Sequence, residues 1–343
     1  MHDPRHPARG LARRFSILLC LSVLVVASVS DAAEPGKRKL RVIAYGDNEG
    51  VLRRPGRDPH ARNEIHQKFL EELKELDARE RIDLILHTGD VVRFDPGPDL
   101  LIQQLGPLLS RFYPTTGGDE EFQLGRYAKF MEAVPHLKEL LEKRIQEDHN
   151  QLEYYYYVEK GGLYVISLFN PDDYGEREYR SRNPFLAENA KIPQLVWLVK
   201  TLEKIRSHEK DAPIIVLSHR PVLNQSRYLT SILDRFGVSL VLSADVHAYA
   251  KGRFGRTLYL LTGIMGDIAV GGCDAINDHQ RRDFQVRYEI CVPEARTIRF
   301  NTSEYMLDHY LDLAVSSREI DIKAITLRDH QVFDSAVQNF GGP

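Results

Sequence analysis

The sequence predicts an α/β sandwich, in which helices cover strands that end along a shared edge. Two observations support this fold class: four apolar runs have the length and composition of buried strands, and stretches with helical periodicity separate them. The runs occupy residues 40–44, 82–86, 214–217 and 238–242. Because the carboxyl ends of strands in α/β sheets meet along one edge, the polar residues that follow these runs are expected to form a site.

Each apolar run ends in side chains of the kinds that bind metal ions. The four segments read YGDNE (45–49), HTGD (87–90), SHRP (218–221) and ADVH (244–247). Carboxylates and imidazoles from four separate strands, delivered to one edge of a sheet, predict a metal centre. Residues Asp47, Glu49, Asp90, His219, Asp245 and His247 lie in these segments.

The segments between the runs complete the α/β pattern. Apolar residues with helical spacing predict helices over residues 65–76, 100–109, 130–141 and 195–205. Pro135 interrupts the third of these helices, because proline lacks the amide hydrogen that a helix interior requires. Residues 154–166, with a central glycine pair, predict a β-hairpin. Its run of four tyrosines favours a strand with alternating faces over a platform on which ligands stack.

The last third of the chain predicts further strands and a less regular tail. Strands are expected over residues 258–262, 284–291 and 297–301, the last two closing the second sheet. The glycine-rich residues 263–272 fit a connecting loop and a phosphate-binding turn equally well. In the tail, residues 305–314 have helical spacing and residues 320–325 alternate like a strand.

The order of these motifs resembles the calcineurin-like metallophosphoesterases, and within them the purple-acid-phosphatase branch. The blocks of that family run D-x-H, G-D-x-x, G-N-H-D/E, H and G-H-x-H, and residues 117–120 (GGDE) take the place of the third. The resemblance covers roughly residues 41–301. It implies a four-layer α-β-β-α sandwich of the metallo-dependent phosphatase type. It also implies a phosphoesterase that hydrolyses phosphate esters with a metal-activated water.

The resemblance assigns the candidate ligands to two ions. Asp90 would bridge them. Asp47, Glu49 and His247 would complete one ion, and His219 and Asp245 would complete the other. Carboxylates at Glu49 and Asp245 replace histidines of the family, which hardens the ligand set. Two divalent ions are expected, with Mn, Fe, Mg or Ca favoured over Zn.

Further departures bear on catalysis. Gly118 replaces a family asparagine and offers no side-chain ligand, and Asp119 replaces the family histidine that assists the leaving group. Asp119 and His219 are the candidate catalytic residues. Because a carboxyl group donates a proton only when it is protonated, Asp119 predicts an acidic pH optimum.

The charge of the proposed centre differs from that of the family. With two divalent ions the net charge of the centre is −1 if five carboxylates are ionised, whereas it is +2 with the two ligating carboxylates of the family. The five carboxylates are Asp47, Glu49, Asp90, Asp119 and Asp245. Phosphate binding then requires protonated carboxyl groups, a trivalent ion, or inward-pointing arginines, and the sequence leaves all three open. Arg93 and Arg220, which adjoin two of the motifs, are the candidate substrate-binding residues. The alternative function is a catalytically degenerate member of the fold that binds a metal or a partner.

Composition narrows the class of partner. The chain has 343 residues with 43% hydrophobic residues and a formal charge of −3, which suits one large domain with a sizeable core. Without a basic block, binding to nucleic acid by bulk charge is not expected. The expected ligand is a phosphorylated small molecule or ester.

The amino-terminal residues predict export. Arg13 and Arg14 precede an uncharged apolar run over residues 15–27, and a small-residue cleavage site follows at 30–32. The run is shorter than the ~20 residues that a membrane-spanning helix needs, so no stable span is expected after cleavage, with an uncleaved anchor as the alternative. The predicted organisation is a signal peptide (1–32), a phosphoesterase domain (33–302) and a C-terminal extension (303–343). The predicted location is periplasmic or secreted, where Cys273 and Cys291 could form a disulfide.

Overall fold

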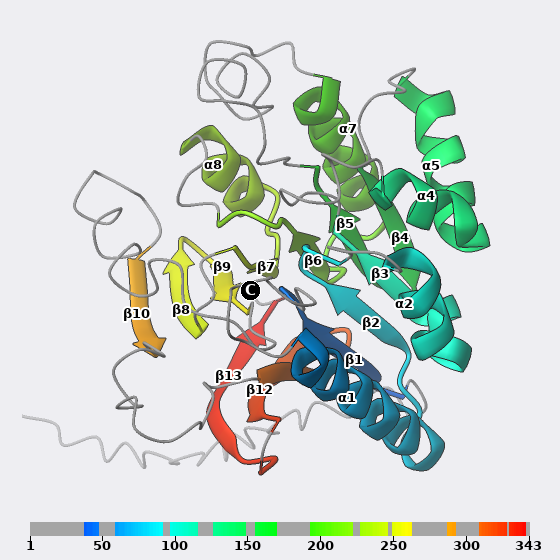
Figure 1. Ribbon diagram of the computed structural model, residues 1–343. Helices are drawn as coiled ribbons and strands as arrows, with labels where there is room; N and C mark the ends of the chain where they lie inside the picture. The colour runs from blue at the N-terminus through cyan, green and yellow to red at the C-terminus, as the bar shows by residue number, and fades with distance from the viewer. Residues whose placement is uncertain are drawn as a thin grey trace, which may run out of the picture. The chain divides into compact units, whose positions relative to one another are not determined.

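Two β-sheets pack face to face, and helices cover their outer faces (Figure 1). The computed structural model describes residues 38–47, 59–91, 97–115, 126–148, 155–169, 193–221, 227–245, 249–262, 287–292, 309–327 and 329–340. Residues 38–343 form one compact unit. The four-layer α-β-β-α sandwich expected from the family resemblance is confirmed.

The first sheet has six strands, in the order β13-β12-β11-β1-β2-β3. Its parallel half pairs β1 with β2 and β2 with β3, and its antiparallel half joins β1 to β11, β12 and β13. The strands are β1 (Leu40–Tyr45), β2 (Leu84–His87), β3 (Phe112–Pro114), β11 (His309–Val315), β12 (Glu319–Thr326) and β13 (Val332–Asn339). Two of the predicted ligand segments therefore follow adjacent parallel strands, β1 and β2.

The second sheet has seven strands, in the order β10-β8-β9-β7-β6-β5-β4. Its centre is parallel from β5 to β9, so β6 and β7 also end along one edge. The strands are β4 (Tyr156–Lys160), β5 (Leu163–Ser167), β6 (Ile214–Leu217), β7 (Leu240–Ser243), β8 (Tyr249–Phe254), β9 (Thr257–Leu261) and β10 (Arg287–Val292). The other two ligand segments follow β6 and β7.

Alternation along β6 explains how the layers form. Ile215 and Leu217 lie in the core that joins the two sheets, whereas Ile214 and Val216 point to the other face. That outer face packs against α7 (Pro193–His208) and α8 (Arg227–Arg235). A fully apolar strand is thus buried on both faces, as expected for a parallel sheet between layers.

Helices on the other side cover the first sheet and continue toward β4. They are α1 (Pro59–Arg79), α2 (Gly97–Leu105) with the 3₁₀ turn η1 (Gly106–Arg111), α4 (Arg126–Ala133) and α5 (Pro135–Asp148). Phe69 and Leu73 of α1 are buried in the same core as β1, which confirms the predicted helix face. Pro135 starts α5, since proline is tolerated at the first position of a helix but not inside one.

The structure corrects the prediction for the tail. A helix was expected over residues 305–314, but residues His309–Val315 form β11, which pairs with β1 along its length. Leu311, Leu313 and Val315 face the core with a period of two, and this pairing outweighs the helical spacing. The described part of the expected extension thus supplies three strands of the first sheet.

Several predictions fall outside the described residues. These are the signal segment, the strand over 297–301 and the glycine-rich residues 263–272. Among the residues that the structure describes, no helix is both long and apolar enough to cross a membrane.

Candidate metal centre

Three aspartates occupy the same unusual backbone conformation directly after strands. Asp47, Asp90 and Asp245 have φ angles of 48°, 51° and 68°, in the left-handed region. Aspartate enters this region more readily than most residues, because its short polar side chain bonds locally. Such strained residues cluster at functional sites, where the surrounding structure holds them in place. The three turns, which follow β1, β2 and β7, therefore mark a candidate site at the carboxyl ends of these strands.

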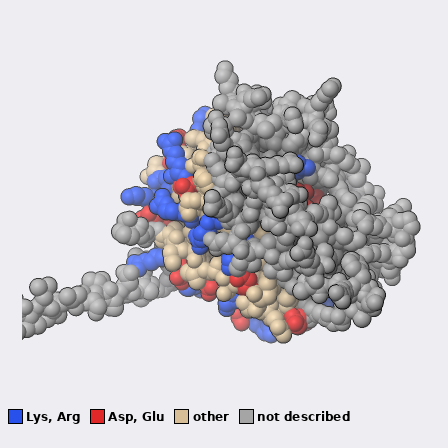
Figure 2. Space-filling model, turned by 90° about the vertical axis from the view of Figure 1, so that its left-hand side faces the viewer, with Lys and Arg blue, Asp and Glu red and all other residues tan. Residues whose placement is uncertain are grey.

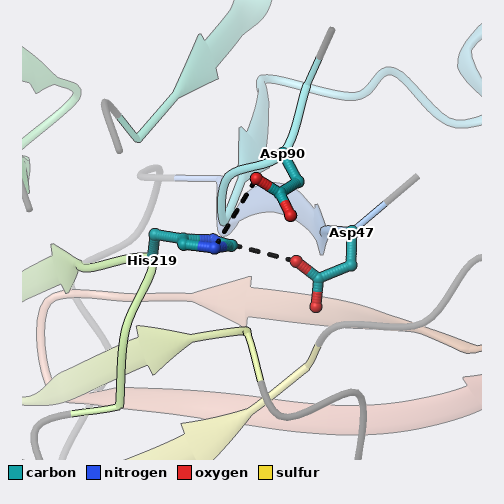
Figure 3. A group of neighbouring side chains, drawn as sticks. All are labelled: Asp47, Asp90 and His219. Atoms are coloured by element: carbon teal, nitrogen blue, oxygen red, sulfur yellow. Dashed lines mark ion pairs between the residues drawn. The ribbon is translucent and has the colours of Figure 1, made fainter. Parts of the chain in front are cut away.

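Asp47, Asp90 and His219 bring potential metal ligands together in the interior (Figure 3). One ligand atom from each lies within 4.8 Å of the others, and all three residues are buried. His219 Nδ1 is 3.7 Å from Asp47 Oδ1, and His219 Nε2 is 3.7 Å from Asp90 Oδ1. These distances exceed a hydrogen bond. The separation of His219 Nε2 and Asp90 Oδ1 matches the roughly 3–4 Å between two atoms that bind one ion at about 2.1 Å each.

Asp245 extends this group toward solvent. Its Oδ1 lies 3.9 Å from His219 Nε2, and its side chain is 26% exposed. Its backbone N–H donates a hydrogen bond of 3.1 Å to Asp47 Oδ2. The turn after β7 therefore holds one oxygen of Asp47 in place and adds a second carboxylate beside His219.

The ring of His219 is oriented by the first sheet. Its Nδ1 lies 3.0 Å from the backbone carbonyl oxygen of Thr88. A carbonyl oxygen can only accept, so Nδ1 carries the proton, and the lone pair of Nε2 faces Asp90 and Asp245. Bonding of the remote ring nitrogen to a carbonyl is the usual way in which proteins fix a metal-binding histidine.

Thr88 joins the two sheets at this edge. Its N–H donates to Tyr45 O (2.9 Å), and its hydroxyl donates to Thr262 O at the end of β9 (2.9 Å). A Cβ atom on Gly46 would lie only 1.9 Å from Thr88 Oγ1, so the close approach requires glycine. The sequence analysis missed Thr88, although a small polar residue beside Gly89-Asp90 was a visible signal.

Buried histidines support the same edge from behind. His87 is fully buried, and its Nδ1 accepts a hydrogen bond of 3.2 Å from the Gly89 N–H. The ring of Tyr45 packs edge-on against it at 4.7 Å. Burial lowers the pKa of His87 well below its usual value, and the charges of His66 and His219 act in the same direction. Burial also lowers the pKa of His66 to about 4, so both rings are neutral at pH 7.

The electrostatics of the group favour a cation. Asp47 and Asp90 are 2% and 6% exposed, and burying carboxylates close together is costly unless positive charge joins them. Two buried carboxylate groups and an imidazole with its lone pair turned inward form a suitable donor set for a divalent ion. The residues therefore fit the metal centre that the motifs predicted.

The structure describes only part of the predicted site. It brings together Asp47, Asp90, His219 and Asp245. Arg220 is half buried next to His219, and its backbone carbonyl accepts a hydrogen bond from the Ser218 hydroxyl. Four other predicted residues, Glu49, Arg93, Asp119 and His247, lie outside the described residues, as does Cys273.

Solved structures show the same fold. The chain is similar to a purple acid phosphatase from yellow lupin seeds (TM-score 0.54, 14% identity), with 89% of this chain and 54% of that chain covered. It thus spans about half the length of the lupin protein. GAP50, the anchor in the inner membrane complex of Plasmodium, is also similar (TM-score 0.50, 12% identity), with 89% of this chain and 90% of that chain covered.

Sequence comparison identifies the family. No curated protein matches the chain. The family model described as calcineurin-like phosphoesterase matches residues 41–249, which is more than half of the chain and contains all four ligand segments. The chain belongs to the calcineurin-like phosphoesterase family.

Proposed function

We propose that the protein is a metal-dependent hydrolase of phosphate esters, with its centre at Asp47, Asp90 and His219. The observation that carries this proposal is the buried group of three ligand atoms within 4.8 Å of one another, supplied by strands of both sheets. Membership of the calcineurin-like phosphoesterase family favours the same reaction class.

The family resemblance suggests how these residues would hold two ions. Asp90 would bridge them, with His219 Nε2 and Asp245 on one side and Asp47 on the other. Glu49 and His247, by their places in the motifs, would complete the ion held by Asp47. When bound, the ions would activate a water molecule and stabilise the charge that develops on the phosphoryl group. The carboxylate-rich set favours Mn, Fe, Mg or Ca over Zn.

The protein's own residues would position the metal ligands and protonate the leaving group. Thr88 fixes the tautomer of His219, and the N–H of Asp245 holds Asp47. We assign proton donation to the leaving group to Asp119, which predicts faster turnover at acidic pH. Arg93 and Arg220 would offset the excess negative charge and contact the phosphate. A rate that rises steadily from pH 5 to pH 9 would contradict the role of Asp119.

Export is part of the proposal and rests on the sequence alone. Residues 1–32 would direct the chain to the periplasm or outside the cell, so its substrate would be a phosphorylated compound found there. Amino-terminal sequencing of the protein from its native source would find Ala33 or Glu34 first. A retained Met1, or an uncleaved apolar run, would contradict the signal peptide.

The function is tested by hydrolysis of an aryl phosphate monoester and diester in the presence of Mn. The wild-type chain should turn over at least one of them, and Asp90→Asn should lower kcat by about 10³-fold or more, because the bridging ligand is lost. Asp99→Asn, on the exposed surface of α2, is the matched control and should retain the wild-type rate.

The binding-protein alternative is distinguished by the same samples. A fold does not by itself imply a function, so a binding role on the same fold is the alternative. A wild-type chain that binds metal but hydrolyses neither ester between pH 4 and pH 9 would replace the enzyme with that alternative.

A further inference from the structure

A second concave site lies at the other end of the second sheet. Its cavity has a volume of about 340 Å³ and is lined by residues from four separate segments of the chain. They include the ends of α7 and α8, the starts of β6 and β7, the turn between β8 and β9, and the end of β13. This volume lies at the lower end of the range typical of small-molecule sites.

The cavity is far from the candidate metal centre. Ala212 precedes β6 and Ser239 precedes β7, whereas His219 and Asp245 follow the same two strands. Since β6 and β7 are parallel, the cavity lies at the amino-terminal ends of these strands and the metal centre at their carboxyl-terminal ends. Ala212 and His219 are seven positions apart in the chain, which corresponds to about 23 Å of extended chain.

The lining is strongly basic. Four cationic side chains, Arg206, Lys210, Arg235 and Arg256, face the cavity with one carboxylate, Asp211. The carboxyl-terminal ends of α7 and α8 add about one negative charge in total. Among the lining residues an excess of about two positive charges remains; Asp234, which is not in the lining, accepts a hydrogen bond of 2.7 Å from the Arg256 N–H and adds one carboxylate nearby. Figure 2 shows Lys and Arg mixed with Asp and Glu over the described part of one face.

Arg206 has a structural role that places its charge at the cavity wall. Its guanidinium donates to the carbonyl oxygens of Phe236 (2.7 Å), Ala212 (2.7 Å) and Gly237 (2.8 Å). Burial lowers the pKa of Arg206; Asp211 raises it and Arg256 lowers it. Arg206 therefore contributes a fixed positive field, while the exposed Lys210, Arg235 and Arg256 remain able to contact a ligand.

Two aromatic rings complete the walls. Phe236 and Phe340 are half buried in the lining, and the guanidinium of Arg235 lies 5.7 Å from the ring centre of Phe236. Guanidinium groups bind phosphate and carboxylate oxygens through paired hydrogen bonds. The combination of several cations and a small volume selects a compact ligand with more than one negative charge.

We propose that this cavity binds a multiply charged oxyanion of phosphate or carboxylate type, independently of the metal centre. It is a second ligand site, formed where β13 of the first sheet meets the starts of β6 and β7. Pyrophosphate and citrate serve as probes of the two chemistries. Titration calorimetry on the full chain at low salt measures the affinity for each, and the tighter of the two probes identifies the preferred oxyanion.

Three charge variants at the rim test the site without disturbing the core. Arg256→Glu and Arg235→Glu should each weaken binding of the preferred probe on the order of tenfold, because an attraction becomes a repulsion. Asp211→Asn should strengthen binding, since it removes the carboxylate of the lining. Arg79→Glu, on an exposed position of α1, is the control for net charge and should leave the affinity unchanged.

Asp90→Asn separates the cavity from the metal centre. Probe binding should persist in this variant, since Asp90 lies at the opposite edge of the sheet. The proposal is overturned if neither probe binds the wild-type chain at millimolar concentration. It is also overturned if Asp90→Asn abolishes binding while Arg256→Glu does not, or if Arg79→Glu weakens binding as much as Arg256→Glu.

Discussion

The backbone carbonyl of Thr88 accepts a hydrogen bond from His219 Nδ1 at 3.0 Å, and this contact connects the two sheets at the metal centre. Thr88 follows β2 in the first sheet, whereas His219 follows β6 in the second. The Thr88 hydroxyl makes another contact between the sheets, to the carbonyl of Thr262. The arrangement of the ligands therefore depends on how the two sheets pack together. Thr88 is a positioning residue, because it orients His219 and contacts both sheets.

Replacing Thr88 separates the effect of its hydroxyl from that of its shape. Thr88→Val keeps the volume but leaves the Thr262 carbonyl without this donor, which should destabilise the fold by about 1–3 kcal/mol. The same change should weaken metal binding, because the docking that orients His219 is loosened. Urea unfolding and metal titration measure the two effects. Thr88→Ser keeps the hydroxyl and should behave more like the wild type. Equal stability of the Thr88→Val and wild-type chains would show that the hydrogen bond to the Thr262 carbonyl does not stabilise the fold.

Gly46 gives a steric test of the same edge. Alanine at this position would place a Cβ atom 1.9 Å from Thr88 Oγ1, so one of the two turns must move. We expect Gly46→Ala to destabilise the fold by about 2–3 kcal/mol, as overpacking does in a tight interior. Chemical denaturation measures the loss.

A double-mutant cycle tests whether contact with Thr88 causes the loss of stability in Gly46→Ala. The Gly46→Ala and Thr88→Ala changes should be strongly non-additive, because Thr88→Ala removes the 1.9 Å contact with Oγ1 and leaves only the 3.1 Å contact with Cβ. Additive losses would show that the alanine acts through another neighbour.

The strand predictions were confirmed where local pattern and packing agree. The strands at β1, β2, β6 and β7 are short apolar runs that end in polar residues, and each is fully or almost fully buried in the sheets. Asp47, Asp90, His219 and Asp245 were predicted because they directly follow these strands. Their convergence depends on parallel strands, a regular feature of α/β folds.

What the sequence missed depends on contacts between distant segments. Residues His309–Val315 pair with β1, some 270 positions earlier, and the local alternation of Leu311, Leu313 and Val315 does not specify that partner. Thr88 was missed for a related reason: its hydroxyl acts on Thr262 and its carbonyl on His219, and both partners are more than a hundred residues away. The left-handed conformation of the three aspartates was also not predicted, because it is set by the turns in which they lie.

Metal binding and stability should be linked at Asp90. In metal-free protein, Asp90→Asn should be at least as stable as the wild type, because one of several clustered carboxylates is removed and asparagine tolerates the left-handed conformation. Excess Mn at about 100 times its dissociation constant should stabilise the wild type by about 2.7 kcal/mol and Asp90→Asn by much less. Thermal unfolding with and without chelator measures the difference.

Asp90→Ala provides the matched comparison for the backbone. Alanine cannot adopt the left-handed conformation as easily, so this variant should be about 1 kcal/mol less stable than Asp90→Asn in metal-free protein. Equal gains from Mn in the wild type and in Asp90→Asn would contradict the assignment of Asp90 as a ligand.

Buried His66 should make the fold less stable in acid. Its folded-state pKa of about 4 lies below the unfolded value near 6.5, so the unfolded chain binds the proton first as the pH falls. The contribution is complete above about pH 6.5 and is lost as the pH falls toward 4, with a loss of about 2 kcal/mol between pH 7 and pH 5. His87 acts in the same direction.

His66→Phe isolates this contribution. The ring volume is retained beside Tyr45, whose centroid is 6.0 Å away, while the titrating group is removed. Urea unfolding at pH 7 and pH 5 should show a smaller difference in this variant than in the wild type, by about 2 kcal/mol. An unchanged difference would show that His66 is not neutral in the fold.

The most direct test of the metal centre is the metal content of the purified chain, measured by elemental analysis on wild type and Asp90→Asn in parallel. We predict about two ions per wild-type chain, as expected for a two-ion centre bridged by Asp90, and a clear loss in the variant. Wild-type protein that holds no metal after exposure to Mn or Fe, or a variant that retains the full content, would contradict the centre at Asp47, Asp90 and His219.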